Sequence, residues 1–440
     1  MIKGLIKRML RKNINRLLTT AYEQSLWEGV AGISHHGIMN IMENEYRANT
    51  PYALTKPIGA SNRFPHFDGL LFNTGQLYQP PLLTNQKVDL SCTLGKRCAR
   101  PMKLAMPIMI SGMGYGVALS KHVSLALARA SGEAGIAFNI GQGAYLNEYR
   151  QLAHRLILQI HGSEWEAKGD VLQKADAIEI KVGQGANGGV QAVIYPETYH
   201  QYDQEVMSDL GLQRHDPETP IYLPSSSQMI NSHGGLNMLI QRLHMEVPGV
   251  PVIVKLAAGN HLERDMEIAI QAGADVLAID GAQGGTHGSP SILVNDFGLP
   301  TLNALVRAVR YLRQTGYDQQ VDLVISGGLR TPGDVLKALA LGASAVYFGT
   351  AALYAATHAQ LAKTLPFDPP TEITWSSGKL KDNFDAQKGS DSLLNFLVSF
   401  ADELQFGLQA LGKSTLQELS ADDLFAWDER VARVTGLPLG

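Results

Sequence analysis

Residues 323–350 read LVISGGLRTPGDVLKALALGASAVYFGT, and this stretch decides the fold. Two short runs of apolar and β-branched residues, 323–326 and 345–348, flank a segment with helical periodicity at 331–341. Both runs are continuously apolar, which is typical of strands buried on both faces in a parallel sheet. The stretch therefore predicts a strand–helix–strand unit of the α/β class.

Six further runs of the same kind precede this unit, and several are followed by segments with helical periodicity. The runs are 107–111, 136–140, 156–160, 177–182, 252–256 and 276–280, and the predicted helices are 119–131, 262–272, 302–314, 331–341 and 351–362. Eight strand–helix steps match a (β/α)8 TIM barrel better than an open doubly wound sheet. An open dinucleotide-binding sheet would need a Gly-x-Gly-x-x-Gly fingerprint, and GMGYG at 112–116 has the wrong spacing.

The remaining sequence predicts elaborations of one barrel. Prolines and glycines punctuate residues 1–85, which we expect to form an amphipathic helix and then a wrapping segment. The barrel is expected to span 86–365, and residues 366–440 to form a C-terminal extension with helices packed on it. Residues 183–250 are long and polar, and we expect them to lie over the C-terminal mouth, where barrel active sites lie.

Composition excludes several classes of function. The 440-residue chain is 45% hydrophobic with a net charge of −4, so it offers no basic surplus for nucleic acid. Cys92 and Cys98 lie six residues apart without a histidine cluster, which predicts reduced thiols in a cytoplasmic protein and no metal site. The pair His35 and His36 also lacks partners at metal-ligand spacing.

Residues 1–18 are cationic and place apolar side chains near helical spacing. Such a helix lies on an anionic membrane or packs on its own domain, and we favour packing while keeping peripheral membrane contact as the alternative. It is not a secretory signal, because its charges are interspersed with its apolar residues. No apolar run in the chain reaches the length needed to span a bilayer.

Glycines follow both of the last two predicted strands. Gly327 and Gly328 follow the first of these strands, and Gly349 with Thr350 follows the second. In TIM barrels the loops after strands seven and eight commonly bind phosphate through backbone N–H groups. Glycine is needed there because a side chain would block close approach of the backbone. The two loops together predict a ligand that carries phosphate, whereas a single Gly-Gly pair would only indicate a turn.

Two other strand ends carry candidate ligand groups. Lys255 lies within the apolar run 252–256, and a buried lysine is costly unless an anion pairs with it. Alternatively, Lys255 has only a structural role, lying at the strand end with its ammonium in water. The segment 280–290, DGAQGGTHGSP, can bring backbone and hydroxyl donors against a flat ring, whereas His287 alone indicates no role. Its candidate ligand residues are Gly284, Gly285 and Thr286.

In this order, the motifs resemble the FMN-binding synthase domain of glutamate synthases and their stand-alone relatives. Five segments carry the resemblance at the front of the barrel and in its middle: PIMISGM at 107–113, NIGQG at 139–143 with Gln142 in place of an acid, IEIKVGQGA at 178–186, VKL at 254–256, and GGT with SP at 284–290. The two glycine loops and the tail from Leu394 to Ser414 continue it. Each motif is weak by itself, but their shared order over residues 85–430 is specific.

The sequence also departs from that family in three ways. We expect no glutaminase domain, and residues 357–370 lack the cysteines that hold the family's iron–sulfur cluster. Asn187 stands where the family has a lysine that contacts the substrate carboxylate. Arg214 and His215 resemble the Arg-His pair that follows, which keeps one candidate carboxylate clamp.

The resemblance implies an FMN-dependent oxidoreductase that transfers hydride between flavin and an amino or imino acid such as glutamate or its imine. It places Lys255 against the reduced flavin, and Gln184 and Arg214 as groups that orient flavin or substrate. The implied FMN contacts are Ser111, Gly112, Met113, Asn139, Gln184, Lys255, Gly284, Gly285, Thr286, Gly327, Gly328, Gly349 and Thr350. An unidentified electron donor or acceptor and a homo-oligomer are implied partners. Two alternatives stay open: a flavin enzyme for another amino or hydroxy acid, and a flavin-binding subunit without turnover.

Overall fold

The computed structural model contains two compact units, which are described separately: Met1–Thr55 and Lys56–Gly440. The described residues are 2–24, 26–49, 51, 53–56, 58–167, 169–190, 192–194, 196, 202–212, 216, 218–223, 226–227, 230, 234–286 and 288–440. The division expected from the sequence, at residues 85 and 365, stays a prediction.

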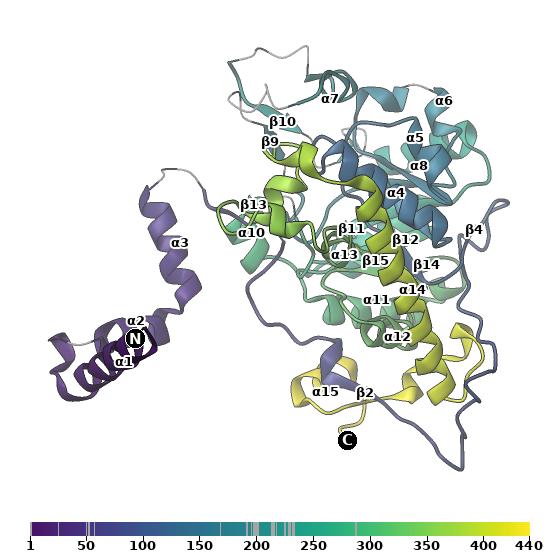
Figure 1. Cartoon of the computed structure of the whole chain (residues 1–440). Coiled ribbons are helices and arrows are strands. Elements are labelled where there is room, and N and C mark those ends of the chain that lie inside the picture. The colour runs from purple at the N-terminus through teal and green to yellow at the C-terminus, as the bar shows by residue number, and fades with distance from the viewer. Residues whose placement is uncertain are drawn as a thin grey trace. The chain divides into compact units, whose positions relative to one another are not determined.

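Eight parallel strands close into a barrel in the larger unit, which confirms the predicted (β/α)8 fold (Figure 1). They are β5 (Ile108–Ile110), β6 (Ala137–Asn139), β7 (Arg155–Ile160), β8 (Ala177–Lys181), β11 (Val252–Ala257), β12 (Val276–Asp280), β14 (Asp322–Ser326) and β15 (Ala345–Phe348). Each strand overlaps one of the eight predicted runs. The ring closes where β15 pairs with β5, so Phe348 lies beside Ile110.

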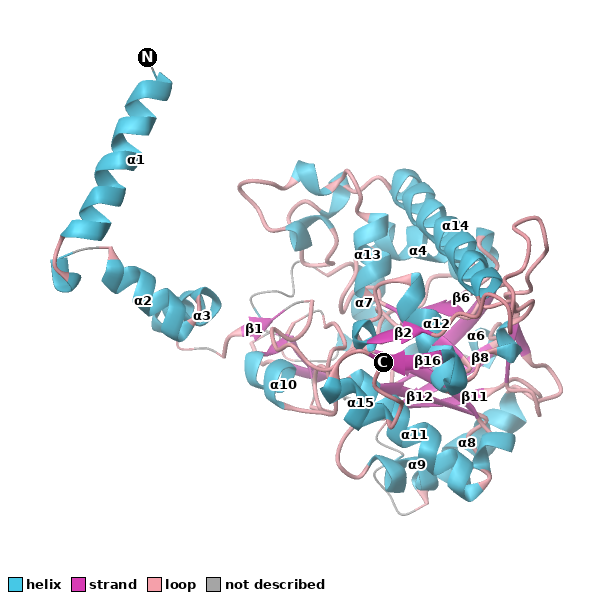
Figure 2. Ribbon diagram, turned by 90° about the horizontal axis from the view of Figure 1, so that it is seen from below, coloured by secondary structure: helices cyan, strands magenta, loops and turns pink. Residues whose placement is uncertain are grey.

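Helices surround the strands, as Figure 2 shows. They include α4 (Lys121–Glu133), α5 (Glu148–Leu152), α6 (Gly169–Leu172), α8 (Gly235–Glu246), α9 (Leu262–Gln271), α11 (Thr301–Thr315), α12 (Pro332–Leu341) and α13 (Thr350–Ala356). In α12, the Thr331 hydroxyl caps the first turn by accepting from the Asp334 N–H, and Gly342 ends the helix with φ 119°. The helix expected to reach residue 362 ends at Ala356, and Ala359, three residues later, has a positive φ of 60° that a right-handed helix does not contain.

The C-terminal segment covers one side of the barrel with the long helix α14 (Ala386–Ala410). This helix packs against α4, α12 and α13, and Phe400 meets Phe348 of β15 edge to face at 5.3 Å between ring centroids. Downstream, β16 (Leu424–Ala426) pairs with β2 (Leu70–Phe72), and α15 (Glu429–Thr435) follows.

The N-terminal end of the barrel is closed by the hairpin of β3 (Cys92–Leu94) and β4 (Met102–Leu104). At the opposite end, the connection after β8 contains β9 (Ala192–Ile194), α7 (Gln204–Asp209) and β10 (Ile221–Leu223). The short strand β13 (Ser289–Pro290) and α10 (Ser291–Asp296) follow β12.

The smaller unit consists of α1 (Ile2–Thr19), α2 (Trp27–His36) and α3 (Ile38–Asn49), and β1 (Thr55–Lys56) follows at its end. The sequence predicted only the first of these helices. Among the described side chains of this unit, only Glu43 is buried. None of the described helices in either unit combines the length and apolar character required to cross a membrane.

Candidate active site at the barrel mouth

Alternate residues of a barrel strand point inward, so the eight strands build layers of side chains across the interior. Inward residues near the strand starts form one buried apolar cluster that includes Met109, Ala137, Ile157, Ala177 and Ile253. Two residues further along the same strands stand Ser111, Asn139, Gln159, Glu179 and Lys255. The interior therefore changes from apolar to polar toward the C-terminal mouth.

Glu179 is the centre of the first polar layer and has no solvent exposure. Its Oε1 accepts hydrogen bonds from Asn139 Nδ2 at 2.8 Å and Gln159 Nε2 at 2.7 Å. Its Oε2 accepts from the Tyr347 hydroxyl at 2.8 Å. Burial and the nearby carboxylate raise the pKa of Tyr347 well above its usual value, so the phenol stays a neutral donor. Three elements of the barrel thus meet on one carboxylate.

Two buried lysines lie side by side on the mouth side of Glu179. Lys181 at the end of β8 pairs in register with Lys255 of β11, and both side chains are almost fully buried. Lys255 Nζ lies 3.9 Å from Asp280 Oδ2, and Lys181 Nζ donates to Gln142 Oε1 at 2.8 Å. Burial, and then the Lys255 cation, lower the pKa of Lys181 to about 8. The pair presents donors and positive charge at the mouth, which suits an anionic or electron-rich ligand.

A neutral histidine lies close to this pair. His161, directly after β7, is buried, and burial followed by the Lys181 cation lowers its pKa to about 3. Its ring Nδ1 lies 3.2 Å from Ser163 Oγ. The imidazole therefore adds no charge to the mouth at neutral pH.

The two glycine loops after β14 and β15 leave backbone donors open. Gly327 and Gly328 have φ values of 117° and 73°, in the region that L side chains rarely adopt. A Cβ on Gly327 would lie 2.5 Å from Thr301 Oγ1. The N–H groups of Gly327, Gly328 and Gly349 donate to no acceptor in the part of the chain that the structure describes. These loops have the properties of an anion cradle.

His66 fixes the first of these loops from a distant part of the chain. Its Nδ1 lies 2.9 Å from Arg330 Nη2, and its Nε2 lies 3.0 Å from the Gly328 carbonyl oxygen. Because a guanidinium can only donate, Nδ1 must accept and Nε2 must carry the proton given to Gly328. Burial is the main cause that lowers the pKa of His66, which favours this neutral form.

The structure brings most of the residues predicted from sequence to this mouth. The Ser111 N–H donates to the Phe348 carbonyl at 2.8 Å, and Gly112 and Met113 follow it directly. A Cβ on Gly112 would lie 3.0 Å from Asn139 Oδ1, so β5 and β6 meet here.

The loops after β12 and β15 also meet at the mouth. A Cβ on Gly285 would lie 2.6 Å from Thr350 Oγ1. Gly284 and Thr286 flank Gly285, and the Thr286 carbonyl accepts from the Ile58 N–H at 3.2 Å. The N–H of Gly185 donates to Asp280 Oδ2 at 3.1 Å, which places the neighbouring Gln184 at the mouth. Arg214, His215 and His287 lie outside the described residues.

Several residues of this mouth were not among the predicted ligands. They are His66, Gln159, His161, Glu179, Lys181, Asp280 and Tyr347. Glu179 and Lys181 carried a usable signal, since they are charged residues two positions apart in an apolar strand and must face the same side.

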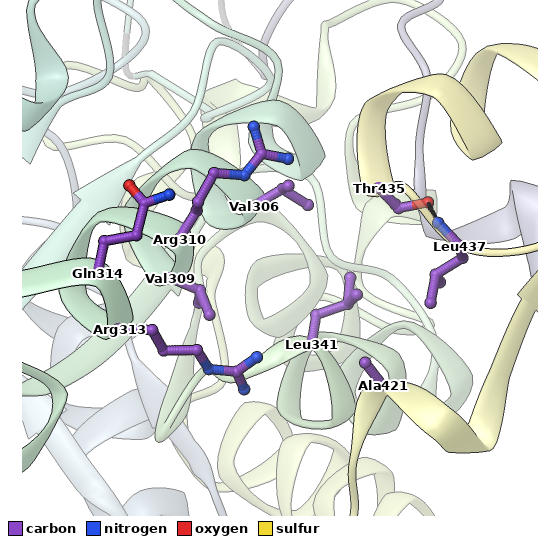
Figure 3. Close-up of a pocket in the computed structure, with 9 residues that line it drawn as sticks. All are labelled: Val306, Val309, Arg310, Arg313, Gln314, Leu341, Ala421, Thr435 and Leu437. Carbon is purple, nitrogen blue, oxygen red and sulfur yellow. Dashed lines mark hydrogen bonds between the residues drawn. The ribbon is translucent and has the colours of Figure 1, made fainter.

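Other parts of the chain offer less to a reactive site. Among the described residues, no three His, Cys, Asp or Glu side chains converge to hold a metal ion. Burial raises the pKa of Cys92 to about 12, so its thiol is not activated. A cavity of about 250 Å³ lies outside the barrel beside α11, where Figure 3 shows its lining. It is lined by Val306, Val309, Arg310, Arg313, Gln314, Leu341, Ala421, Thr435 and Leu437, away from the strand ends.

A family model described as the conserved region in glutamate synthase matches residues 77–414. The chain belongs to the glutamate synthase family. The match includes all eight barrel strands and both glycine loops, but not His66.

Individual relatives agree with this assignment. The chain is 33% identical over 402 residues to a glutamate synthase large subunit-like protein of Rhizobium meliloti (strain 1021), which covers 87% of this chain and 89% of the relative. It is 30% identical to an archaeal-type glutamate synthase (NADPH) of Dehalococcoides mccartyi, over 86% of this chain and 78% of that protein.

Solved structures resemble the fold at low identity. An oxidized active mutant of (S)-mandelate dehydrogenase gives a TM-score of 0.52 at 18% identity, covering 82% of this chain and 88% of the other. A flavocytochrome b2 mutant gives 0.52 at 16% identity, covering 87% and 83%. These likenesses support the barrel fold alone.

Proposed function

We propose that this glutamate synthase family member is an FMN-dependent oxidoreductase acting on the carbon that carries an amine or imine, with glutamate and 2-oxoglutarate as the reference substrates. One observation carries the proposal: the buried Lys181–Lys255 pair stands at the same barrel mouth as the open glycine loops. A single ligand with an electron-rich ring and one phosphate would satisfy both.

The residues present fit FMN. The Gly327–Gly328 and Gly349–Thr350 loops would hold its phosphate, because their N–H groups have no acceptor among the described residues. Gly112 leaves no room for a side chain, since its Cβ would lie 2.8 Å from Gln159 Nε2. FMN, when bound, supplies the hydride chemistry.

The chain's own residues would bind the flavin and orient the substrate. Lys255 would hold the flavin edge where negative charge develops, and Asp280 keeps its ammonium in place at 3.9 Å. Lys181, whose pKa of about 8 leaves it mostly protonated at pH 7, would offer the substrate carboxylate a cation. Gln184 and Arg214 would orient flavin or substrate. The connection after β8 would limit access of water to the mouth.

The purified protein is expected to be yellow and to release FMN rather than FAD. The reason is a phosphate cradle built on two adjacent loops, in a chain without a dinucleotide fingerprint. Mass spectrometry of the released flavin tests this, together with absorbance after reconstitution. Stoichiometric iron should be absent, because two cysteines cannot supply the thiolates of a cluster. Release of FAD, or no flavin at all after reconstitution, would contradict the cofactor assignment.

The Lys255→Met protein should have a lower flavin midpoint potential than the wild type. Met keeps the length and packing but removes the charge, so Asp280 loses its ion-pair partner and keeps the hydrogen bond from the Gly185 N–H. A charge-assisted hydrogen bond is worth about 1.5–3 kcal/mol, which corresponds to roughly 30–60 mV for two electrons. FMN should still bind, because the phosphate loops are untouched. The measurement is a redox titration of both proteins.

Lys337→Met is the matched control, since Lys337 is a half-buried lysine on α12, outside the barrel mouth. It should alter stability without altering the potential. An unchanged potential in Lys255→Met with flavin fully bound would mean that Lys255 is a structural strand-end lysine.

A flavin oxidoreductase for a different amino or hydroxy acid is the second candidate. Asn187 and Gln142 favour it, because each stands where the resembling family has a charged residue, and Gln142 Oε1 accepts from Lys181 Nζ at 2.8 Å. Anaerobic reduction of the flavin by a panel of amino and 2-hydroxy acids separates the two, with NADPH included because several relatives carry it in their names. A flavin that no donor bleaches would instead indicate a binding subunit without turnover.

A further inference from the structure

The smaller unit exposes large apolar side chains at a far higher density than the barrel unit. Among the described residues, 14 of them lie within 6–46, whereas 20 lie within 56–440. In the small unit they are Ile6, Met9, Leu10, Ile14, Leu18, Tyr22, Leu26, Trp27, Val30, Ile33, Ile38, Met39, Met42 and Tyr46. No described large apolar side chain of this unit is buried. Helices that bury none of their apolar residues need another surface.

The charge of this unit points to the nature of that surface. Its first helix, α1, contains six Lys and Arg, and the first acidic residue of the chain is Glu23. Residues 1–55 contain seven basic and four acidic residues, although the whole chain carries −4. The apolar and cationic features therefore coincide in one segment.

On α1 the two kinds of side chain are interleaved. Ile6, Leu10 and Ile14 repeat every four residues and share one face of the helix. Lys7 and Arg11 are each the next residue after one of these and flank that face. A surface that binds this helix must bury its apolar face and supply negative charge beside that face.

We propose that α1, α2 and α3 form a docking surface for a membrane rich in anionic lipid, with α1 lying in the headgroup layer. The apolar face would enter the acyl boundary while the flanking lysines and arginines reach lipid phosphates. Trp27 is 39% exposed at the start of α2, and tryptophan favours this same interfacial depth. The catalytic barrel is thereby delivered to a membrane surface.

Two other surfaces that could cover these helices, a second copy of the chain and the barrel unit, fit less well. A second copy would bring one cationic α1 against another, which like charges oppose. The barrel unit carries its acidic side chains at fixed positions. Lipid headgroups can move, so an anionic phosphate can lie beside each cation of α1. Both alternatives give distinct outcomes in the test below.

The experiment is co-sedimentation of the full-length protein with vesicles. Vesicles of phosphatidylcholine with 30% phosphatidylglycerol should bind the protein, vesicles of pure phosphatidylcholine should bind it far less, and 0.5 M salt should release it. The Lys7→Gln/Arg11→Gln protein should bind about 30-fold more weakly, since each basic residue near such a surface contributes about fivefold. Lipids brominated in the acyl chain should quench tryptophan fluorescence in the wild type, and Trp27→Phe should lose that quenching.

Lys87→Gln/Lys103→Gln is the matched control, because both lysines are exposed on the barrel unit and lose the same charge. It should bind vesicles as the wild type does. The proposal is overturned if anionic vesicles bind no protein, if this control is weakened as much as the α1 variant, or if the α1 variant changes only the oligomeric state in gel filtration. None of these outcomes bears on the flavin, so the proposed function is tested independently.

Discussion

The Gly327→Ala protein is expected to bind FMN about 30-fold more weakly than the wild type. Gly327 has φ 117°, and a Cβ there would meet Thr301 Oγ1 at 2.5 Å and the Gly281 carbonyl at 3.1 Å. The loop must shift to relieve this strain, and strain of this kind costs about 2 kcal/mol. That shift would turn the open N–H groups of the loop away from the phosphate. Titration of the apoprotein with FMN, followed by quenching of flavin fluorescence, gives the dissociation constant.

Gly342→Ala is the control, because it has the same kind of strain at a remote place. Gly342 has φ 119°, and its Cβ would lie 2.9 Å from Val309 Cγ1 at the end of α12. Both variants should be less stable than the wild type, but only Gly327→Ala should lose FMN affinity. Equal FMN affinity in the two variants would show that the β14 loop does not hold the phosphate.

The barrel could be predicted because its strands are buried on both faces. Their outer residues pack under helices and the inward residues at their starts pack in the interior, so the runs read as continuously apolar. The run 276–280 coincides with β12 at both ends. The closure of the ring depends on the pairing of β15 with β5, and the sequence indicated it only through the number of runs.

The second and third helices of the smaller unit were not predicted, for different reasons. Gly29 and Gly32 lie inside α2, and each glycine costs a helix about 1 kcal/mol relative to alanine. In α3 a signal was present, since Ile38, Met42 and Tyr46 repeat every four residues and share one face. Local propensity therefore accounts for the missed α2 but not for the missed α3.

Part of the candidate site could be predicted from the sequence and part could not. Lys255 was predicted because a charge interrupts an apolar run, and the same reasoning applies to Glu179 and Lys181 in the run 177–182. Their partners depend on strand register, since Gln159 reaches Glu179 from the neighbouring β7. His66 lies 262 residues from Gly328 in the chain, and no local pattern connects the two.

The Glu179→Leu protein should lose about 4 kcal/mol of unfolding free energy. The carboxylate accepts from Asn139, Gln159 and Tyr347, and leucine would leave those buried donors without an acceptor at about 1–3 kcal/mol each. It would also remove a negative charge that supports the protonated form of Lys181. Urea unfolding of the apoprotein, followed by circular dichroism, measures the loss.

A graded series of Glu179 variants separates the loss of the hydrogen-bond acceptor from the loss of the negative charge. Glu179→Gln keeps an acceptor oxygen but not the charge, so it should fall between Glu179→Leu and the wild type. Glu133→Gln, on the exposed end of α4, should remain within about 0.5 kcal/mol of the wild type. If Glu179→Gln were as damaging as Glu179→Leu, the charge beside Lys181 and Lys255 would be the dominant cause. If both Glu179 variants matched Glu133→Gln, the polar layer would not stabilise the barrel.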